Sequence, residues 1–446
     1  MFDPRKEVRA ERALIVGHYQ TLDAAEPDLA LDELASLVEA AGGVVAGRSY
    51  QRGRPGTSSI SPATFVGKGK AEEMGNLAES LEASIVVFDN ELSPAQIREL
   101  EKVMGRKVID RSELILDIFA SRARTREAKL QVELAQLEYT APRLRGMWTH
   151  LERQAGTGGS GVGMGMKGPG EKQIEIDRRI VGAKVTQLKG ELGKIHGRRK
   201  REVKARGRTT FTVGLVGYTN AGKSTLMNAV TDAETYSADQ LFATLDTKTR
   251  RWRVKPGAEV ALSDTVGFVR NLPHHLVASF RSTLEEAIHA HLLLHVVDAS
   301  HPQALEQVEA VEKVLVELGC DLSRSLPVLN KVDQVTDFDA FELLKRRLPG
   351  AVTISAKEGT GLRDLAESVV LRRMDHWVTL SLEGQAGDGR LHAFVRARGL
   401  VREERYDETV WHAEVELPKV DLPELRRMEN VTISVGAHSS TSVTSD

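Results

Sequence analysis

Short apolar runs alternate with amphipathic stretches over residues 11–118. The runs ALIVGHY, GGVVAGRSY, ASIVVFDN and RKVIDR have the length and composition of strands, whereas LDELASLVEAA and SPAQIRELEKVM have helical spacing. This alternation is typical of an α/β fold, so we expect residues 1–118 to form an N-terminal α/β domain. FVGKGK within it looks like a phosphate loop but lacks a glycine at the required spacing, which favours an ordinary loop.

A different period follows in residues 119–209. Apolar residues recur there at alternating steps of four and three, which is the pattern of a helical seam. The first seam and the second seam are Leu130, Leu134, Leu137, Ala141, Leu144, Trp148 and Leu151, then Val181, Val185, Leu188, Leu192 and Ile195. Two seams joined by a short connection predict an antiparallel helical hairpin. Pro142 should kink its first helix, and Gly182, Gly190, Gly193 and Gly197 should weaken its second.

The tip loop of this hairpin, residues 156–171, reads GTGGSGVGMGMKGPGE. A flexible spacer would explain the glycines. The competing hypothesis is a tip that inserts into a crowded cavity, because glycine permits close backbone approach and methionine fits irregular surfaces. Both interpretations remain open from the residues alone.

Buried strands return from residue 210 onwards. The runs FTVGLVG, EVALSDTVGF, LLLHVVDAS, SLPVLNKVD and AVTISAKEG, separated by helical stretches, predict a doubly wound parallel sheet over residues 210–375. Ligands of such sheets bind at the carboxyl ends of the strands. Alternation in WVTLSLE and WHAEVELP predicts a small C-terminal α+β domain over residues 376–446, and the final SSTSVTSD should be disordered.

The stretch GYTNAGKST fits G-x-x-x-x-G-K-[ST] between a strand and a helix. Its amides would surround a β-phosphate, Lys223 would reach the β- and γ-phosphate oxygens, and the Ser224 hydroxyl would bind Mg²⁺. Asn220 and Ala221 would shape the loop. The expected nucleotide contacts here are Gly217, Tyr218, Thr219, Asn220, Ala221, Gly222, Lys223, Ser224 and Thr225.

Two later motifs complete a triphosphate site. In LSDTVGF, Asp264 ends a strand as a carboxylate that can hold Mg²⁺, and the Gly267 amide can approach a γ-phosphate. LFATLD supplies Thr244 for the metal and the γ-phosphate, although a lone threonine is equally compatible with loop capping. We expect hydrolysis to use Lys223, Thr244 and Gly267, and Mg²⁺ to bind Ser224, Thr244 and Asp264. The neighbouring contacts are Phe242, Ala243, Leu245, Asp246, Thr265 and Val266.

NKVD and SAK predict that the base is guanine. The Asp333 carboxylate can accept hydrogen bonds from guanine N1–H and the exocyclic amine, neither of which adenine offers. The Lys331 stem could cover the base, and SAK could give a backbone donor to guanine O6. The base-site residues are Asn330, Lys331, Val332, Asp333, Ser355, Ala356 and Lys357. The four motifs in this order therefore predict GTP as substrate and GDP as product.

Phe268 occupies the position after Gly267 where many GTPases carry a glutamine that orients water. An apolar side chain cannot do this, so we expect slow intrinsic hydrolysis that a partner stimulates. His274 and His275 are expected to be surface or packing residues.

Charge is distributed unevenly along the chain. The net charge is −2, but residues 178–208 hold twelve Lys or Arg against two Glu. This excess predicts a polyanionic partner; nucleic acid is favoured over a membrane surface because the seam already uses the apolar residues. We expect no stable membrane insertion, because no apolar run is long enough to span a bilayer. The charged N-terminus and the single cysteine, Cys320, favour the cytoplasm.

Over roughly residues 10–375 the motifs above, together with FVGKGK, the helical arm and GTGGSG…GPGE, resemble the HflX family of GTPases. The resemblance implies GTP-dependent binding to the large ribosomal subunit and splitting or rescue of stalled ribosomes, with the tip near the peptidyl-transferase centre. The resemblance implies that the polyanionic partner is ribosomal RNA and that Ser224 and Thr244 bind Mg²⁺. It also implies a phenylalanine after the glycine of the third motif, which is Phe268 here.

We therefore expect a monomeric, multidomain α/β protein with a P-loop GTPase domain. One alternative is a nucleotide-gated RNA-binding regulatory module that acts on a non-ribosomal partner. Another is a GTPase domain that directs a bound modification or protease partner.

Overall fold

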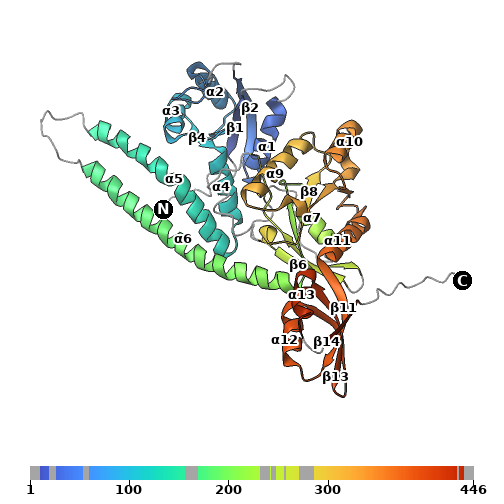
Figure 1. Ribbon diagram of the computed structural model, residues 1–446. Helices are drawn as coiled ribbons and strands as arrows, with labels where there is room; N and C mark the ends of the chain where they lie inside the picture. The colour runs from blue at the N-terminus through green and yellow to red at the C-terminus, as the bar shows by residue number, and fades with distance from the viewer. Residues whose placement is uncertain are drawn as a thin grey trace. The chain divides into compact units, whose positions relative to one another are not determined.

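A computed structural model of the chain describes residues 11–19, 27–53, 60–155, 169–231, 242, 248–255, 258–270, 286–428 and 431–435 (Figure 1). The chain forms two compact units. The first contains Met1–His196, Ala238–Asp246 and Asn271–Ser282, and the second contains Gly197–Ser237, Thr247–Arg270 and Thr283–Asp446. Parallel sheets with covering helices occur in both, so the predicted multidomain α/β class is confirmed.

The first unit contains a four-stranded parallel sheet in the order β2-β1-β3-β4. Its strands are β1 (Arg12–Tyr19), β2 (Val44–Arg52), β3 (Ile85–Phe88) and β4 (Lys107–Asp110). Its helices are α1 (Pro27–Ala40), α2 (Lys68–Ser80), α3 (Pro94–Met104) and α4 (Arg111–Arg122). One core, which includes Leu14, Met74 and Leu100, lies between the sheet and helices α2 and α3. FVGKGK leads into α2, with Gly67 at the N-cap.

Buried ion pairs fill the place where an open α/β sheet ordinarily binds its ligand, the carboxyl ends of the strands at the reversal of strand order. Arg111 contacts Asp89 at 2.7 Å and Glu33 at 2.9 Å. The Tyr19 hydroxyl donates to the other oxygen of Asp89 at 3.0 Å. These contacts join β1, β3 and α4 into one polar network.

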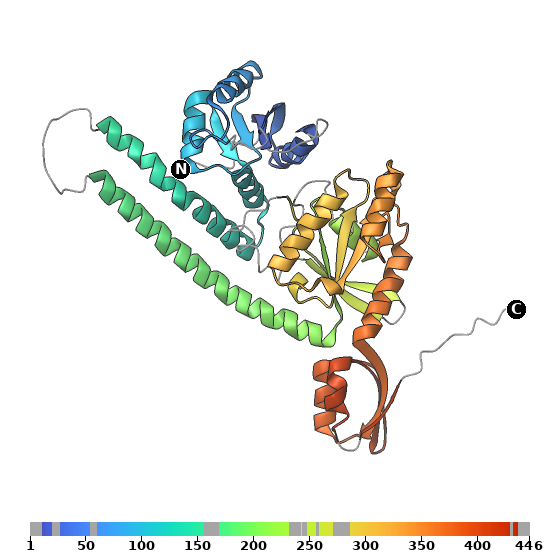
Figure 2. The ribbon, with the colours of Figure 1, turned by 45° about the horizontal axis from the view of Figure 1, so that its top comes forward.

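The predicted hairpin consists of α5 (Arg126–Ala155) and α6 (Pro169–Thr209), which run side by side (Figures 1 and 2). Leu134, Leu188 and Leu192 are buried between the two helices, as the seam predicted, and Leu130, Leu137 and Val185 pack around them. Lys184 and Lys189 of α6 pair with Glu133 and Glu138 of α5 at 3.2 and 2.8 Å. The side chains of Leu144, Trp148 and Leu151 lie outside the described residues.

One boundary of the hairpin differs from expectation. Helix α5 includes Pro142 and α6 includes the four glycines, so the kink and the weakening stay predictions. Helix α6 begins at Pro169, within the stretch predicted as tip loop, because proline is well suited to the first turn, where its missing N–H is not needed. Residues 156–168 of the tip lie outside the described part of the chain.

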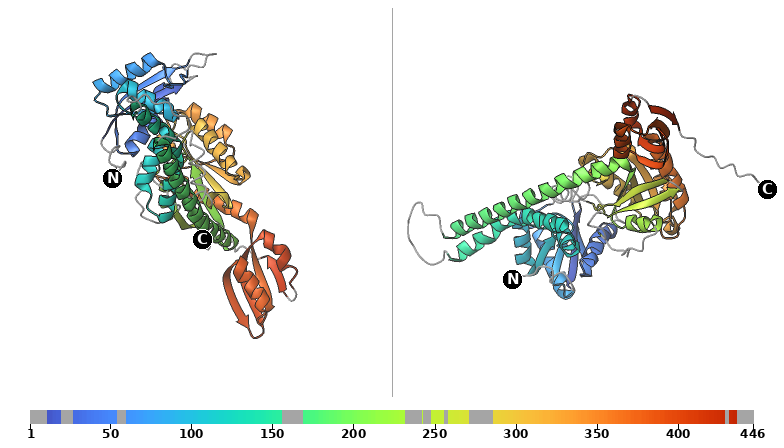
Figure 3. Two further views of the ribbon diagram at one scale, coloured as in Figure 1. Left: turned by 90° about the vertical axis from the view of Figure 1, so that its left-hand side faces the viewer. Right: turned by 90° about the horizontal axis from the view of Figure 1, so that it is seen from below.

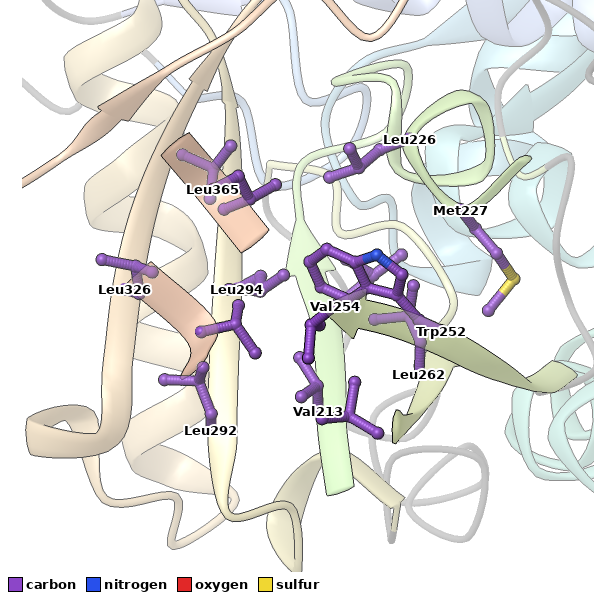
Figure 4. Close-up of a cluster of buried hydrophobic side chains, with 14 of the residues drawn as sticks. Val213, Leu226, Met227, Trp252, Val254, Leu262, Leu292, Leu294, Leu326 and Leu365 are labelled. Atoms are coloured by element: carbon purple, nitrogen blue, oxygen red, sulfur yellow. The ribbon is translucent and has the colours of Figure 1, made fainter. Parts of the chain in front are cut away.

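The second unit contains a six-stranded sheet in the order β10-β9-β8-β5-β7-β6. The strands are β5 (Thr212–Gly217), β6 (Lys248–Lys255), β7 (Ala258–Asp264), β8 (Leu292–Asp298), β9 (Ser325–Asn330) and β10 (Val352–Thr353). They are covered by α7 (Lys223–Val230), α9 (Ala304–Glu317), α10 (Phe338–Arg347) and α11 (Leu362–His376), with short 3₁₀ turns η2 (Leu322–Arg324) and η3 (Val332–Gln334). Figure 4 shows the core, in which Trp252 packs with Val213, Leu262 and Leu294.

Strand β6 departs from the predicted all-parallel sheet. It pairs antiparallel with β7 and forms the edge of the sheet. Its inward residues, Trp252 and Val254, alternate with exposed Arg251, Arg253 and Lys255. Such a polar outer face is common in an edge strand.

The C-terminal part of this unit forms a separate antiparallel sheet in the order β12-β13-β11-β14. Its elements are β11 (Trp377–Gln385), α12 (Gly389–Arg398), β12 (Leu400–Asp407), β13 (Val410–Pro418), η4 (Lys419–Asp421), α13 (Leu422–Leu425) and β14 (Val431–Val435). Helix α12 covers one face of the sheet over a core centred on Trp411 (Figure 3). The predicted tail segment, residues 439–446, is outside the described residues. Within the described ranges, no helix is long and apolar enough to cross a membrane.

Candidate nucleotide-binding site

The P-loop connects β5 to α7 through two glycines with positive φ. Gly217 has φ 148° and Gly222 has φ 90°. A Cβ at Gly217 would overlap the carbonyl oxygen of Val296, and a Cβ at Gly222 would overlap the side-chain nitrogen of Asn330. The turn therefore requires glycine at both ends for steric as well as conformational reasons.

Lys223 lies in the centre of this loop. Its Nζ donates to the carbonyl oxygens of Gly217 at 3.0 Å and Tyr218 at 2.7 Å. Burial lowers the pKa of Lys223 to about 8, and the charge of Asp264 opposes that shift. The loop thus holds a desolvated cation at the N-terminus of α7, where the helix dipole also favours an anion.

A hydroxyl and a carboxylate meet beside the lysine. Ser224 Oγ donates to Asp264 Oδ2 at 2.7 Å, which joins α7 to the end of β7. Thr265 Oγ1 donates to the Leu215 carbonyl at 2.7 Å and fixes the chain after Asp264. Thr219 Oγ1 is buried without a hydrogen-bond partner, so the loop offers one more hydroxyl to a ligand.

These donors fit a magnesium–nucleotide site. Mg²⁺ in such sites is typically held by one or two protein oxygens, with phosphate and water oxygens completing the octahedron. Ser224 and Asp264 provide that limited set. The described residues contain no cluster of three or more His, Cys, Asp or Glu side chains that could hold a metal alone.

The segment after β7 pairs with the P-loop through its backbone. The Thr219 N–H donates to the Phe268 carbonyl at 2.7 Å, and the Phe268 N–H donates to the Gly217 carbonyl at 3.2 Å. Gly267 is so close that an added Cβ would lie 2.8 Å from Thr219 Cγ2 and 3.1 Å from Lys223 Nζ. Gly267 thus lies against the phosphate loop, as expected, while the Phe268 ring is buried.

Asn330 joins the P-loop to the SAK segment. It is 2% exposed; its Nδ2 donates to the Ala221 carbonyl at 2.8 Å, and its Oδ1 accepts from the Ala356 N–H at 2.9 Å. One of the three backbone N–H groups of SAK, that of Ala356, is therefore bonded to Asn330 in this structure.

Lys331 and Asp333 follow Asn330 along the chain. Asp333 is exposed, and a hydrogen bond from the Ser355 hydroxyl is the main cause that lowers the pKa of its carboxyl. Lys331 has φ 62°, a left-handed conformation, and its Nζ lies 2.6 Å from Asp298 Oδ2. An ionised carboxylate accompanied by a lysine stem is suited to the edge and face of a guanine base.

Most of the predicted site residues are thus brought to one edge of the sheet. The P-loop residues, Asp264 to Gly267, NKVD and SAK all follow the carboxyl ends of β5, β7, β9 and β10. Phe242 is buried, and its ring contacts that of Phe119 within the first unit, with centroids 4.7 Å apart. Ala243, Thr244, Leu245 and Asp246 lie outside the described residues, as do His274 and His275.

Sequence reasoning did not identify Asp298. It ends β8 and lies opposite Asn330 in the register of β8 with β9. The sequence pattern that could have identified it is an aspartate at the end of the apolar run LLLHVVD, because the other motifs also follow the ends of predicted strands.

Comparison with known families divides the chain into three matched segments. Residues 28–120 match the family described as "GTP-binding GTPase N-terminal", residues 122–206 match "GTP-binding GTPase Middle Region", and residues 212–331 match "50S ribosome-binding GTPase". None of these three models extends over the C-terminal sheet.

Full-length relatives give a consistent result. The chain is 42% identical to GTPase HflX of Escherichia coli K12 over 426 residues, 95% of this chain and 97% of that protein. It is 44% identical to GTPase HflX of Chlamydia pneumoniae over 423 residues, 93% of this chain and 88% of that protein. Among solved structures, a GTP-binding protein from Sulfolobus solfataricus in complex with GDP is similar with a TM-score of 0.41 and 23% identity, over 81% of this chain and 99% of that one.

Proposed function

Because the chain belongs to the HflX family of GTPases and accordingly binds and hydrolyses GTP, we propose that it does so on the large ribosomal subunit, where it splits or rescues stalled ribosomes. The observation that carries this proposal is the match of residues 212–331 to a ribosome-binding GTPase family. In this proposal the protein acts as a monomer in the cytoplasm, and ribosomal RNA is its polyanionic partner.

The domain boundaries are part of the proposal. Residues 1–118 form the N-terminal domain, 119–209 the hairpin, 210–375 the GTPase domain and 376–446 the C-terminal domain. Two of the three family matches end close to the first two of these boundaries, at residues 120 and 206.

The side chains of the phosphate site have distinct roles in the proposed reaction. Lys223 places a positive charge against the β- and γ-phosphate oxygens, and the loop amides and the α7 N-terminus donate to the same anion. Gly267, at its short separation from Lys223, gives an N–H close to the γ-phosphate. Ser224 and Asp264 would hold Mg²⁺, with Thr244 as the third candidate ligand. Bound Mg²⁺ would offset the charge that develops on the phosphate oxygens.

The base site gives the proposal its nucleotide specificity. Asp333 accepts from guanine N1–H and the exocyclic amine, and adenine would leave this carboxylate without a partner. Asp333→Asn should weaken GTP binding and improve binding of xanthosine triphosphate, measured by calorimetry with both nucleotides. Unchanged selectivity would contradict the assignment of NKVD to the base.

Helix α6 supports RNA as the partner. Arg179, Lys194, Lys200 and Arg201 are exposed. Lys184 and Lys189, by contrast, are paired with α5. The hairpin therefore neutralises part of the positive charge of α6 and leaves at least these four exposed basic side chains on its surface, as expected of a helix that contacts phosphates.

Sedimentation with purified ribosomal subunits and a non-hydrolysable GTP analogue tests the proposal. We expect co-migration with the large subunit and its loss when the four exposed basic residues Arg179, Lys194, Lys200 and Arg201 are changed to Glu. Changing Arg346 and Arg347 of α10, two exposed arginines, to Glu is the control for altered charge. RNA binding without co-migration would favour the non-ribosomal regulatory module instead.

A further inference from the structure

Strand β8 ends in a fixed carboxylate that belongs to none of the nucleotide motifs. Asp298 is 8% exposed. Its Oδ1 accepts the N–H of Ser300 at 3.0 Å and the Ser300 hydroxyl at 2.6 Å, and its Oδ2 lies 2.6 Å from Lys331 Nζ. One oxygen thus holds the carboxylate in place, and the other holds the lysine.

The main chain of Lys331 is equally restrained. Its φ of 62° is a strained conformation for a residue with a side chain. The preceding Asn330 is bonded to both the phosphate loop and the SAK loop. The Asn330 carbonyl also accepts the Ala299 N–H at 2.9 Å, which links the ends of β8 and β9. The Cα and the ammonium of Lys331 are thus both restrained, and so is the stem between them.

We propose that Asp298 is a positioning residue for the guanine site. It holds the Lys331 side chain in place before the nucleotide arrives, so that the methylene groups of the lysine form a wall for the base. An unanchored lysine would lose its rotamer freedom when the base binds, whereas here that entropy is lost during folding. The inference rests on the assignment of NKVD to guanine in the proposed function.

A purely structural role for this ion pair would have a different consequence. The β8 and β9 ends are already joined by the Ala299–Asn330 hydrogen bond and by the strand pairing. A pair that only strengthened this junction would change the unfolding temperature and leave nucleotide release unaltered. The two roles are therefore separable by kinetics.

Asp298→Asn tests the inference, because the amide oxygen can still accept from Ser300 while the charge that holds Lys331 is removed. We expect fluorescently labelled GDP to dissociate about five- to tenfold faster in stopped-flow measurements, in line with the loss of one partly buried ion pair. Asp321→Asn is a matched control. Asp321 Oδ1 accepts the Ser323 N–H at 3.0 Å and Oδ2 lies 3.7 Å from Arg324 Nε, a similar set of partners on a more exposed carboxylate before the opposite end of β9. Release from this control should remain within about twofold of wild type.

Lys331→Met provides the second variant, since it keeps an apolar stem and removes the ammonium. It should accelerate release by a similar factor, and Asp298→Asn should add nothing in its background. Unchanged release in Asp298→Asn, or a full Asp298→Asn effect in the Lys331→Met background, would overturn the inference. Asp333→Asn measured in parallel distinguishes the failures: altered base selectivity there would leave the guanine site in place, so that only the role of Asp298 would be wrong.

Discussion

Replacement of Gly222 by alanine should separate the effect of backbone strain from that of a specific contact in the P-loop. Gly222 has φ 90°, and an added Cβ would overlap Asn330 Nδ2. Gly350, with φ 77°, is a matched site in the same unit, where an added Cβ would meet nothing within 4 Å. Both substitutions place alanine in the left-handed region, and only Gly222→Ala displaces a neighbouring side chain.

The magnitude follows from the bonds that Asn330 would lose. Left-handed alanine costs about 1 kcal/mol at either site. At Gly222 the displaced amide also loses its bonds to Ala221 and Ala356, at 2.8 and 2.9 Å. Each lost bond costs about 1–1.5 kcal/mol. We therefore expect Gly222→Ala to destabilise the second unit by about 3–4 kcal/mol and Gly350→Ala by about 1 kcal/mol.

Nucleotide affinity provides the more specific measurement. If the two bonds hold the phosphate and base loops in register, their loss should weaken GDP binding by about 30- to 150-fold in titration calorimetry, since 1.4 kcal/mol corresponds to tenfold. Gly350→Ala should bind GDP as wild type does. Equal effects of the two substitutions on calorimetric unfolding and on GDP affinity would refute the reasoning, because strain alone would then account for both.

Three further predictions concern buried charge in the second unit. Burial is the main cause that lowers the pKa of both His291 and His295 to about 4, so the unfolded chain binds more protons below pH 6.5. The free energy of unfolding should then fall as pH drops from 6.5 towards 4, by up to about 1.4 kcal/mol per pH unit for each histidine, and His295→Leu should show a shallower fall in urea denaturation. Because desolvation lowers the pKa of Lys223 to about 8, GDP affinity should decline above that pH. The free energy of unfolding of the nucleotide-free protein should rise between that pH and about pH 10.5, where only the unfolded chain keeps the lysine protonated. A Lys223→Met variant with the same rise would contradict this. Glu416→Ala should cost about 3–5 kcal/mol in scanning calorimetry because it leaves the Arg373 guanidinium buried without its carboxylate, and a loss below about 1 kcal/mol would show that the pair is not needed.

The nucleotide motifs could be predicted from the sequence because each depends on local chain geometry. Gly217, Gly222 and Lys223 have a fixed spacing, and their meaning follows from a strand before them and a helix after them. A parallel sheet then places the ends of β5, β7 and β9 on one edge, so motifs far apart in sequence become neighbours. The hairpin seam was predictable for a similar reason, because the spacing of its apolar residues can be recognised within the sequence of each helix separately.

Contacts between separate motifs could not be predicted from the sequence in the same way. Nothing in NKVD alone shows that Asn330 accepts the Ala356 N–H, because this bond depends on how β9 and β10 are placed side by side. The same holds for Asp298, which becomes meaningful only in register with Asn330. Strand β6 was missed because its alternation of Trp252 and Val254 with basic residues is short and lies between two motif-bearing segments.

The position of Phe268 explains why holding GTP and hydrolysing it should be separate tasks in this protein. Its N–H and carbonyl are bonded to Gly217 and Thr219, and its ring is buried, so the residue serves to attach the segment after β7 to the phosphate loop. A glutamine there could point towards a water only by leaving this buried position. In the proposed site, the described residues around Lys223 would supply charge and hydrogen bonds for phosphates, but the Phe268 side chain has no group that could orient a nucleophile. We therefore expect the rate of hydrolysis to be set by a partner that orders the attacking water. GTP would then be cleaved because the partner has bound, and the intrinsic rate of cleavage would not determine how long the partner stays bound.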